Sequence, residues 1–202
     1  MLGKKTLLAA ASFAALSASV SVLAYGSMSA PYGWYAEGNI GATRISNENN
    51  PPGSSTTNSG LGGNINVGYK FMPYFAAEVG YTQYSSQDIK DQTGTKAANN
   101  KRHSIDLAGK GIVPVYDSGL ELFAKVGVQR LYSRVSLSNS AAANNIGLSS
   151  SDNTATGLYL GVGGQYYFTP EIAMVGQWQR AEGSNRTGTA DLYSIGVSAI
   201  FG

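Results

Sequence analysis

The most regular pattern in this chain is an alternation of apolar and polar residues, repeated in runs of about ten residues. In the last run, YSIGVSAIFG at residues 193–202, apolar or aromatic residues stand at nearly every second position and small or polar residues stand between them. Side chains of a β-strand point alternately to its two faces, so this segment has one apolar face and one polar face. The pattern therefore predicts a strand that separates two different environments.

Eight runs of this kind follow one another along the chain. They lie at residues 34–45, 61–71, 74–84, 103–113, 120–135, 157–168, 171–180 and 192–201. An even number of alternating strands of about ten residues is typical of transmembrane barrels of the bacterial outer membrane. No segment after the N-terminal region has an apolar run long enough for a membrane helix.

The connections between the runs alternate in length. Those at residues 47–59, 85–101 and 136–156 are long and rich in Asn, Ser, Thr and Gly, and the one at residues 181–191 is intermediate. The other connections are tight and contain Pro: residues 72–73, 114–119 and 169–170. Long extracellular loops that alternate with short periplasmic turns are typical of outer-membrane barrels. We therefore predict an all-β, eight-stranded antiparallel up-and-down transmembrane β-barrel with its loops outside the cell.

Position parity sorts the strand residues onto two faces, of which we assign the apolar one to lipid and the polar one to the lumen. A soluble β-sandwich or a lipocalin-like barrel would instead bury the apolar face. Against these alternatives, the charges stand in the middle of strands, whereas the loops carry mostly uncharged polar groups. Aromatic residues gather near the predicted strand ends, which is typical of the two girdles at the membrane interfaces.

The N-terminal residues resemble a secretory signal peptide. Lys4 and Lys5 precede an apolar run that ends at Val22-Leu23-Ala24, so we predict a signal peptide at residues 1–24 and the barrel at residues 25–202. A cut after Ala30 and an uncleaved membrane anchor are the less favoured alternatives.

Removal of the signal peptide changes the charge balance. The chain has 14 Lys and Arg against 12 Asp and Glu, and residues 1–24 hold two Lys and no acid, which leaves 12 against 12. This balance gives no support to a nucleic-acid-binding protein. There is no Cys, so disulfides and thiolate metal sites are excluded. We predict no cofactor and no metal site.

Short motifs make residues 34–202 resemble the eight-stranded OmpA-like membrane domain. The motifs are Trp34-Tyr35 with Gly38 and Gly41, Glu78-Val79-Gly80-Tyr81, Lys125-Val126-Gly127, and Ser194-Ile195-Gly196-Val197-Ser198 followed by Phe201. The resemblance implies an outer-membrane location and a final aromatic strand that is read by the assembly machinery. The peptidoglycan-binding domain of longer family members is not expected here, so cell-wall tethering is not carried over.

The resemblance also implies a network of ion pairs in the lumen. Glu78 and Lys125 match two of its positions, but two further positions hold Gln165 and Val175 instead of charges. A buried charge must be paired or it destabilises the fold. Asp106 and Lys110 lie four residues apart on the same strand face and could contribute to a different network. From their shared parity we predict a lumen network made of Glu37, Glu78, Asp106, Lys110, Glu121 and Lys125.

Two other sets of residues are candidates for chemistry. His103 and Ser104 are adjacent, and similar barrels that hydrolyse lipid A place their His and Ser two positions apart on one face, so we predict no catalytic residues and no enzyme. Arg44, Arg130 and Arg180 stand on the lipid face at the outer ends of strands, where guanidinium groups can reach lipopolysaccharide phosphates. The alternative is that these arginines are solvated residues of the rim.

The function that best fits these features is non-enzymatic. We expect an outer-membrane barrel for envelope integrity and for surface interaction or adhesion through its extracellular loops. A small low-conductance diffusion pore is the alternative, and a lipid A-modifying hydrolase is the less favoured one. The expected partners are outer-membrane lipid and lipopolysaccharide, with host or matrix ligands at the loops and no nucleic acid. We expect a monomer.

Overall fold

The computed structural model describes residues 31–46, 55–56, 59–90, 93–115, 118–145, 149–184 and 187–201. The predicted signal peptide and its cleavage site lie outside the described residues. Within the described part of the chain, no helix is long and apolar enough to cross a membrane.

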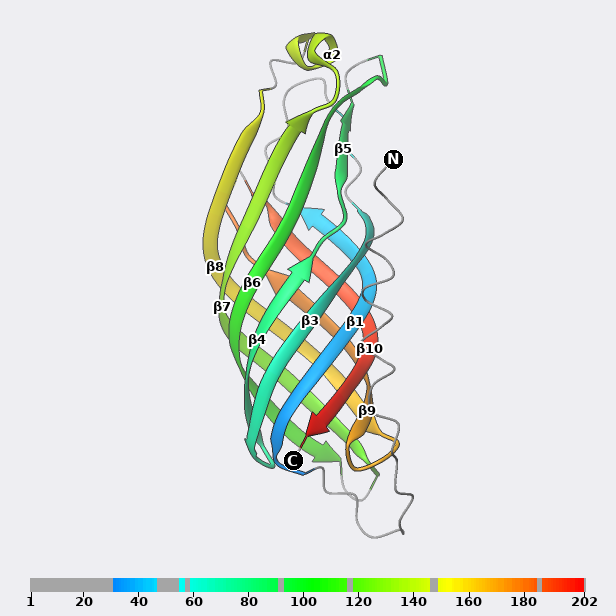
Figure 1. The fold of residues 1–202 in the computed structure, drawn as a ribbon, viewed down its shortest axis with the longest axis vertical. Helices are drawn as coiled ribbons and strands as arrows, with labels where there is room; N and C mark the ends of the chain where they lie inside the picture. The colour runs from blue at the N-terminus through cyan, green and yellow to red at the C-terminus, as the bar shows by residue number, and fades with distance from the viewer. Residues whose placement is uncertain are drawn as a thin grey trace.

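Eight long strands form the wall of a closed antiparallel barrel (Figure 1). They are β1 (Gly33–Ser46), β3 (Ser59–Met72), β4 (Phe75–Gln83), β6 (Lys96–Val115), β7 (Leu120–Leu137), β8 (Ser151–Tyr167), β9 (Ile172–Ala181) and β10 (Thr189–Phe201). The last strand closes the ring by pairing with the first, from Trp34 opposite Phe201 to Ser46 opposite Thr189. The predicted eight-stranded up-and-down barrel is confirmed.

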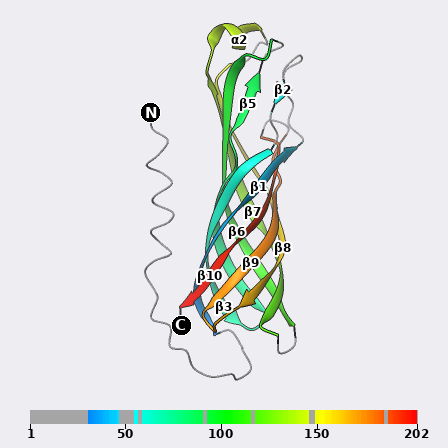
Figure 2. The ribbon, with the colours of Figure 1, turned by 90° about the vertical axis from the view of Figure 1, so that its right-hand side faces the viewer.

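The barrel has one side much taller than the other (Figures 1 and 2). Strands β6, β7 and β8 have 20, 18 and 17 residues, whereas β4 and β9 have 9 and 10. Gln83, the last residue of β4, pairs with His103, and residues 96–102 of β6 continue beyond this point. At about 3.3 Å per residue these seven residues add about 23 Å along the strand. We call the upper parts of β6, β7 and β8, with the elements packed on them, the tall wall.

Two segments predicted as loops contain part of this tall wall. Residues 85–101 hold the short strand β5 (Gln87–Lys90), which pairs with the upper end of β6, and β2 (Ser55–Thr56) pairs with β5. Residues 136–156 hold the helix α2 (Ser140–Asn145) and the start of β8. A small apolar cluster joins these elements and includes Ile89, Ala97, Ala98, Ala142 and Ala143. Its members are mostly alanines in an Asn- and Ser-rich sequence, which is why the segments resembled loops.

The outward face of the barrel carries an apolar belt between two aromatic rims. Exposed residues of the belt include Ile40, Ile65, Val67, Val79, Leu107, Val126, Val128, Ile195 and Val197. At the end with short turns, Trp34 packs edge-on against Tyr69, and at the other end Tyr81 and Tyr132 flank His103. On β6 the outward positions His103, at one rim, and Val113, at the short-turn end, are ten residues apart. On a tilted strand this corresponds to about 25 Å, the height of the apolar band of an outer-membrane barrel.

Candidate functional site: the lumen and the outer rim

The six charged residues predicted to face the lumen all point inward and are at most 7% exposed. They are Glu37 on β1, Glu78 on β4, Asp106 and Lys110 on β6, and Glu121 and Lys125 on β7. Charged side chains are almost never this deeply buried unless they are paired, so their contacts decide what the lumen can do.

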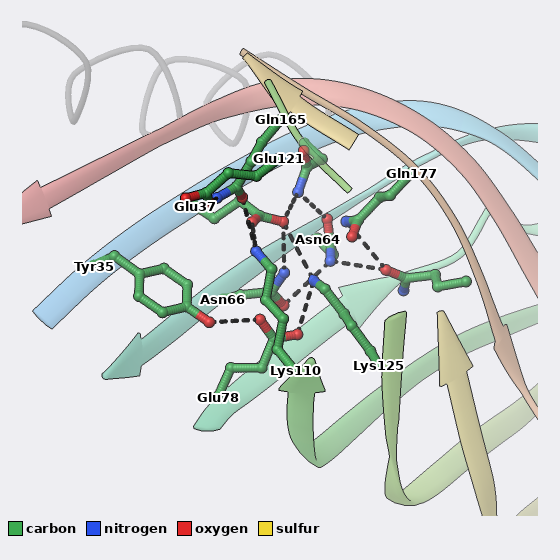
Figure 3. Close-up of polar contacts among 12 residues, drawn as sticks. Tyr35, Glu37, Asn64, Asn66, Glu78, Lys110, Glu121, Lys125, Gln165 and Gln177 are labelled. Atoms are coloured by element: carbon green, nitrogen blue, oxygen red, sulfur yellow. Dashed lines mark hydrogen bonds and ion pairs between the residues drawn. The ribbon is translucent and has the colours of Figure 1, made fainter. Parts of the chain in front are cut away.

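Lys125 and Lys110 join two buried glutamates into one network (Figure 3). The ammonium nitrogen of Lys125 lies 2.8 Å from Glu78 Oε1 and 3.5 Å from Glu37 Oε1. Lys110 Nζ lies 3.6 Å from Glu37 Oε2 and donates a 2.9 Å hydrogen bond to Gln165 Oε1. Strands β1, β4, β6, β7 and β8 thus meet through charges at the centre of the barrel.

Neutral side chains complete the coordination of the two glutamates. The amide groups of Asn39 and Asn66 donate to Glu37 Oε1 at 2.8 and 3.0 Å, and the Tyr35 hydroxyl donates to Glu78 Oε2 at 2.8 Å (Figure 3). Hydrogen bonds to buried charges offset part of their desolvation. The parity of these residues had placed the asparagines in the lumen, but their pairing with Glu37 depends on distances across the barrel.

Glu121 belongs to a separate pair nearer the short-turn end. Its carboxylate accepts from Lys70 at 2.8 Å and from the Gln165 amide at 2.6 Å. Gln165 also donates to the Tyr167 hydroxyl at 2.9 Å. Lys70 was not among the predicted network residues, although it shares the parity of the inward-facing Asn66 and is equally buried.

Asp106 and Lys110 face the same side of β6 but do not contact each other. Residues four apart on a strand are about 13 Å apart along it, which is too far for a carboxylate and an ammonium group to meet. Neither carboxylate oxygen of Asp106 has a hydrogen-bond partner among the described residues. The carboxylate lies against Gly80, where a Cβ atom would come within 2.6 Å of both oxygens. The absence of a side chain at Gly80 thus makes room for Asp106.

Apolar layers fill the lumen on both sides of the polar network. On the short-turn side, one buried cluster includes Tyr35, Ala76, Ile112, Phe123, Tyr167, Ala173, Val175 and Ile200. On the other side, a second cluster includes Ile45, Tyr84, Leu131, Ala181, Ala190 and Leu192. A cavity of about 10 Å³ beside Lys70 and Lys110 has room for about one water molecule. The lumen is therefore a packed core.

The turn between β9 and β10 folds inward over the upper end of this core. Arg102 on β6 is fully buried; its Nε donates a 3.0 Å hydrogen bond to the Thr187 carbonyl, and its guanidinium group also contacts Gln87 Oε1. Gln129 Nε2 donates to the Glu182 carbonyl at the start of the same turn. Arg102 was missed because its position falls between the predicted loop at residues 85–101 and the predicted strand at residues 103–113.

His103 and Ser104 face opposite sides of the wall. The His103 ring stacks on Tyr132 outside the barrel, with ring centres 4.9 Å apart and planes 10° apart. Ser104 points into the lumen, where its hydroxyl lies 3.3 Å from the Tyr84 hydroxyl. The two side chains therefore cannot act as a dyad. Among the described residues, no three His, Asp or Glu side chains are grouped so that they could hold a metal ion.

The three rim arginines point outward but differ in their contacts. Arg180 donates two hydrogen bonds to Asp191, at 2.8 and 3.1 Å, and lies over the Trp178 ring. Arg130 lies over Tyr132, with 5.6 Å between its guanidinium carbon and the ring centre. Arg44 is exposed. The charge of Arg180 is thus already neutralised by a neighbour.

Solved structures with the same arrangement of strands come from bacterial outer membranes. OprG of Pseudomonas aeruginosa superposes with a TM-score of 0.62 at 17% sequence identity, over 87% of this chain and 99% of that one. Neisserial surface protein A superposes with a TM-score of 0.58 at 20% identity, over 84% and 97% of the two chains. Ail, the attachment invasion locus protein of Yersinia pestis, gives 0.51 at 13% identity, over 84% and 99%. At these identities the likeness shows the fold alone.

No curated protein sequence matches the chain. The outer membrane protein beta-barrel domain, by contrast, matches residues 6–201, which is nearly the whole sequence. This match agrees with the closed ring of eight strands and with the apolar belt on its outward face. The chain belongs to the outer membrane protein beta-barrel family, and the protein is a barrel of the bacterial outer membrane.

Proposed function

We propose that this protein is a closed, non-enzymatic scaffold of the outer membrane that supports envelope integrity and makes surface contacts through its extracellular tall wall and loops. The observation that carries the proposal is the filled lumen. The interior of an eight-stranded barrel is just wide enough for side chains to fill. Here ion pairs fill its centre, apolar clusters fill both sides, and the β9–β10 turn covers its mouth.

The tall wall is the part that is suited to external contact. In the tall wall, three strands extend beyond the aromatic rim. An apolar cluster under α2 holds its elements together without support from lipid. Loops and edges held on a rigid scaffold are the usual place for binding residues. Two proteins with this fold have names that refer to the cell surface and to attachment, which is consistent with this role but shows only the fold.

Conductance separates the closed scaffold from the alternative, a small diffusion pore. Purified protein in a planar lipid bilayer is expected to give no stable single-channel steps, because each polar layer of the lumen is covered by an apolar one. An outer-membrane porin with an open channel, reconstituted in the same bilayer, serves as the positive control. Stable, sizeable steps from the unaltered protein would support the pore and overturn the scaffold.

Surface contact is tested by shortening the tall wall. Tyr132 lies directly opposite Thr154, so residues 133–153 can be replaced by an Asn-Gly turn that joins the two strands. Cells that display the shortened, folded barrel are expected to attach to an epithelial monolayer several-fold less than cells with the full barrel. Equal attachment would contradict a contact role of the tall wall.

We also propose that Arg44 and Arg130 contact lipopolysaccharide phosphates, whereas Arg180 contributes less. The support is their outward position at the rim and the pairing of Arg180 with Asp191. Replacing Arg44 and Arg130 together with Gln is expected to weaken lipopolysaccharide binding several-fold, and Arg180→Gln serves as the matched control with a smaller effect. Unchanged binding in the double variant would contradict this contact.

We infer that the protein does not modify lipid A. The opposite orientations of His103 and Ser104 support this inference. Mass spectra of lipid A from cells with and without the protein are expected to be identical, and a new deacylated species would overturn the inference.

A further inference from the structure

Strand β8 is paired on one side only in its upper part. Residues 151–158 pair with β7, from Val135 opposite Ser151 to Val128 opposite Leu158. Pairing with β9 begins only at Tyr159, opposite Ala181, and runs toward the periplasmic end. In the described part of the chain no strand pairs with the other side of residues 151–157. This part of β8 forms the margin of the tall wall (Figure 1).

The direction of the backbone groups along this margin follows from one hydrogen bond. Glu182 N donates to Leu158 O at 2.9 Å, so the backbone of Leu158 faces the β9 side. Backbone N–H and C=O groups point to alternate sides of a strand at successive residues. The backbone groups of Thr156, Thr154 and Asp152 therefore point along the open edge, while the residues between them pair with β7.

The edge is open because the chain after β9 turns away from it. A Cβ atom at Gly157 would lie 2.1 Å from the Glu182 carbonyl oxygen, so the chain passes directly over this glycine. The same carbonyl accepts from Gln129, and Arg102 binds Thr187 further along the turn. The turn that covers the mouth of the lumen is thus the segment that would otherwise have paired with the upper part of β8.

The chemistry of this edge suits an incoming strand. The outward side chains of Thr154 and Thr156 are exposed, and Thr has a high propensity for strands. The carboxylate of Asp152 is held by two hydrogen bonds from Arg134, at 2.8 and 3.2 Å. Natural sheets often protect an edge with an unpaired charge or a proline, whereas the charge at Asp152 is paired and residues 151–157 contain no proline.

We propose that the edge of β8 at residues 152–156 binds an extended peptide segment of a partner protein as an additional strand of the tall wall. Recognition would come from backbone hydrogen bonds, so the bound segment is defined by its extended conformation more than by its side chains. This proposal rests on the proposed surface-contact function and names the kind of partner and the place where it binds.

Two substitutions at one position test the role of the backbone. Thr154→Pro removes the N–H group that points along the edge but leaves the ladder with β7 intact, because Pro is tolerated where the N–H faces outward on an edge strand. Thr154→Ala removes the side chain and keeps the N–H. The probe is a fluorescein-labelled decapeptide of alternating Thr and Val, measured by fluorescence anisotropy with the folded full-length barrel in detergent micelles.

We expect Thr154→Pro to weaken binding of this peptide at least tenfold and Thr154→Ala to change it less than twofold. A peptide methylated at every second amide nitrogen, on the side that faces β8, should fail to bind. Hydrogen exchange at the amides of Thr154 and Thr156 should slow when the unmodified peptide is added. Failure of the unaltered barrel to bind, equal binding by Thr154→Pro, or an equal loss in Thr154→Ala would overturn the proposal.

Cell attachment distinguishes the failure of this proposal from the failure of the proposed function. If cells with Thr154→Pro attach like unaltered cells while removal of residues 133–153 abolishes attachment, the edge is not the binding site and the surface-contact function stands. If removal of residues 133–153 leaves attachment unchanged, the surface-contact function itself fails, whatever the peptide does.

Discussion

A single strand, β6, crosses two regions of the molecule whose outward faces differ in polarity. In the membrane-spanning part its inward residues Asp106 and Lys110 are charged, and its outward residue Leu107 is exposed and apolar. In the tall wall its inward residue Ala98 is fully buried in an apolar cluster, while Lys101 is exposed on the outward side. The outward face of the strand thus changes from apolar to polar where the strand leaves the membrane, whereas its inward face is buried in both regions and carries the charged Arg102 in the tall wall.

The difference shows that the surroundings of the wall decide which residues each face can hold. Lipid offers no partner to a polar group, so the outward face of the spanning part must be apolar. Charges are tolerated in the lumen because facing strands supply counter-charges and amides. Above the membrane, water solvates the outside, and ordinary burial of apolar side chains can hold the elements together.

The largest expected effect comes from breaking the lumen network. Lys125→Met would leave Glu37 and Glu78 without their shared ammonium group, and removal of one partner from a buried ion pair destabilises by about 3–5 kcal/mol. The measurement is the free energy of unfolding in urea for the barrel in lipid vesicles. Lys96→Met removes a half-exposed pair with Asp88 and should change it by about 1 kcal/mol or less. Equal effects would show that burial of the network contributes nothing.

A charge on the lipid face should have the next largest effect. Ile195 is 68% exposed in the middle of the apolar belt. Ile195→Lys is expected to lower the free energy of unfolding by about 2–4 kcal/mol, the range for Lys near the middle of the bilayer. Ser136→Lys, at an exposed outward position of β7 in the tall wall, should have almost no effect. A similar loss in both variants would contradict the difference between the outward faces of the two regions.

A buried charge in the tall wall should act locally. Ala143 of α2 is fully buried, and Ala143→Asp should destabilise the packing of α2 on β6 by about 1–3 kcal/mol. Faster proteolysis and faster hydrogen exchange are expected in α2 and β5, without a shift in the urea unfolding of the barrel. Ala141→Asp places the same charge on the exposed side of the helix and is the control. Unfolding of the whole barrel by Ala143→Asp would show that the two regions fold as one unit.

The smallest effect concerns pH. A hydrogen bond from Lys96, together with one from Asn99, holds the pKa of the Asp88 carboxyl below its ordinary value of about 3.9. The contribution to the stability of the β5–β6 pair is therefore complete above the ordinary pKa and is lost as the pH falls through the lower, folded value. An NMR titration of the Asp88 carboxyl carbon measures this shift, and hydrogen exchange in β5 should quicken below it. Titration at the ordinary value would contradict the contacts, and Asp88→Asn should remove the pH dependence.

Position parity predicted much of the spanning barrel because each face there has one uniform environment. It placed Glu37 and Lys125 in the lumen and Ile195 on the outside before any contact was known, and the match to the family confirms the architecture. Parity says which side a residue faces and nothing about its distance to residues on other strands. Parity therefore gave no sign that Asp106 has no hydrogen-bond partner among the described residues.

The sequence pattern predicted little of the tall wall. Its apolar cluster consists mainly of alanines, which contribute little to a hydrophobic pattern, and its strands are rich in Asn, Ser and Thr. The start of β8 at Ser151 therefore looked like a loop, and so did residues 96–101 of β6. The open edge of β8 has no signal in the sequence, because it depends on where the neighbouring strand ends.

The uninterrupted ladder between β6 and β7 has a consequence for how the barrel assembles. It runs from Ala98 opposite Leu137 to Val115 opposite Leu120 without a register shift, through both regions. A slip of β6 by one residue would turn the lumen charges Asp106 and Lys110 toward lipid and, in the same step, turn Arg102 away from Thr187 and Gln87. A misaligned pairing therefore costs free energy at both ends of β6. Correct pairing of the extracellular part fixes the register of the part within the membrane.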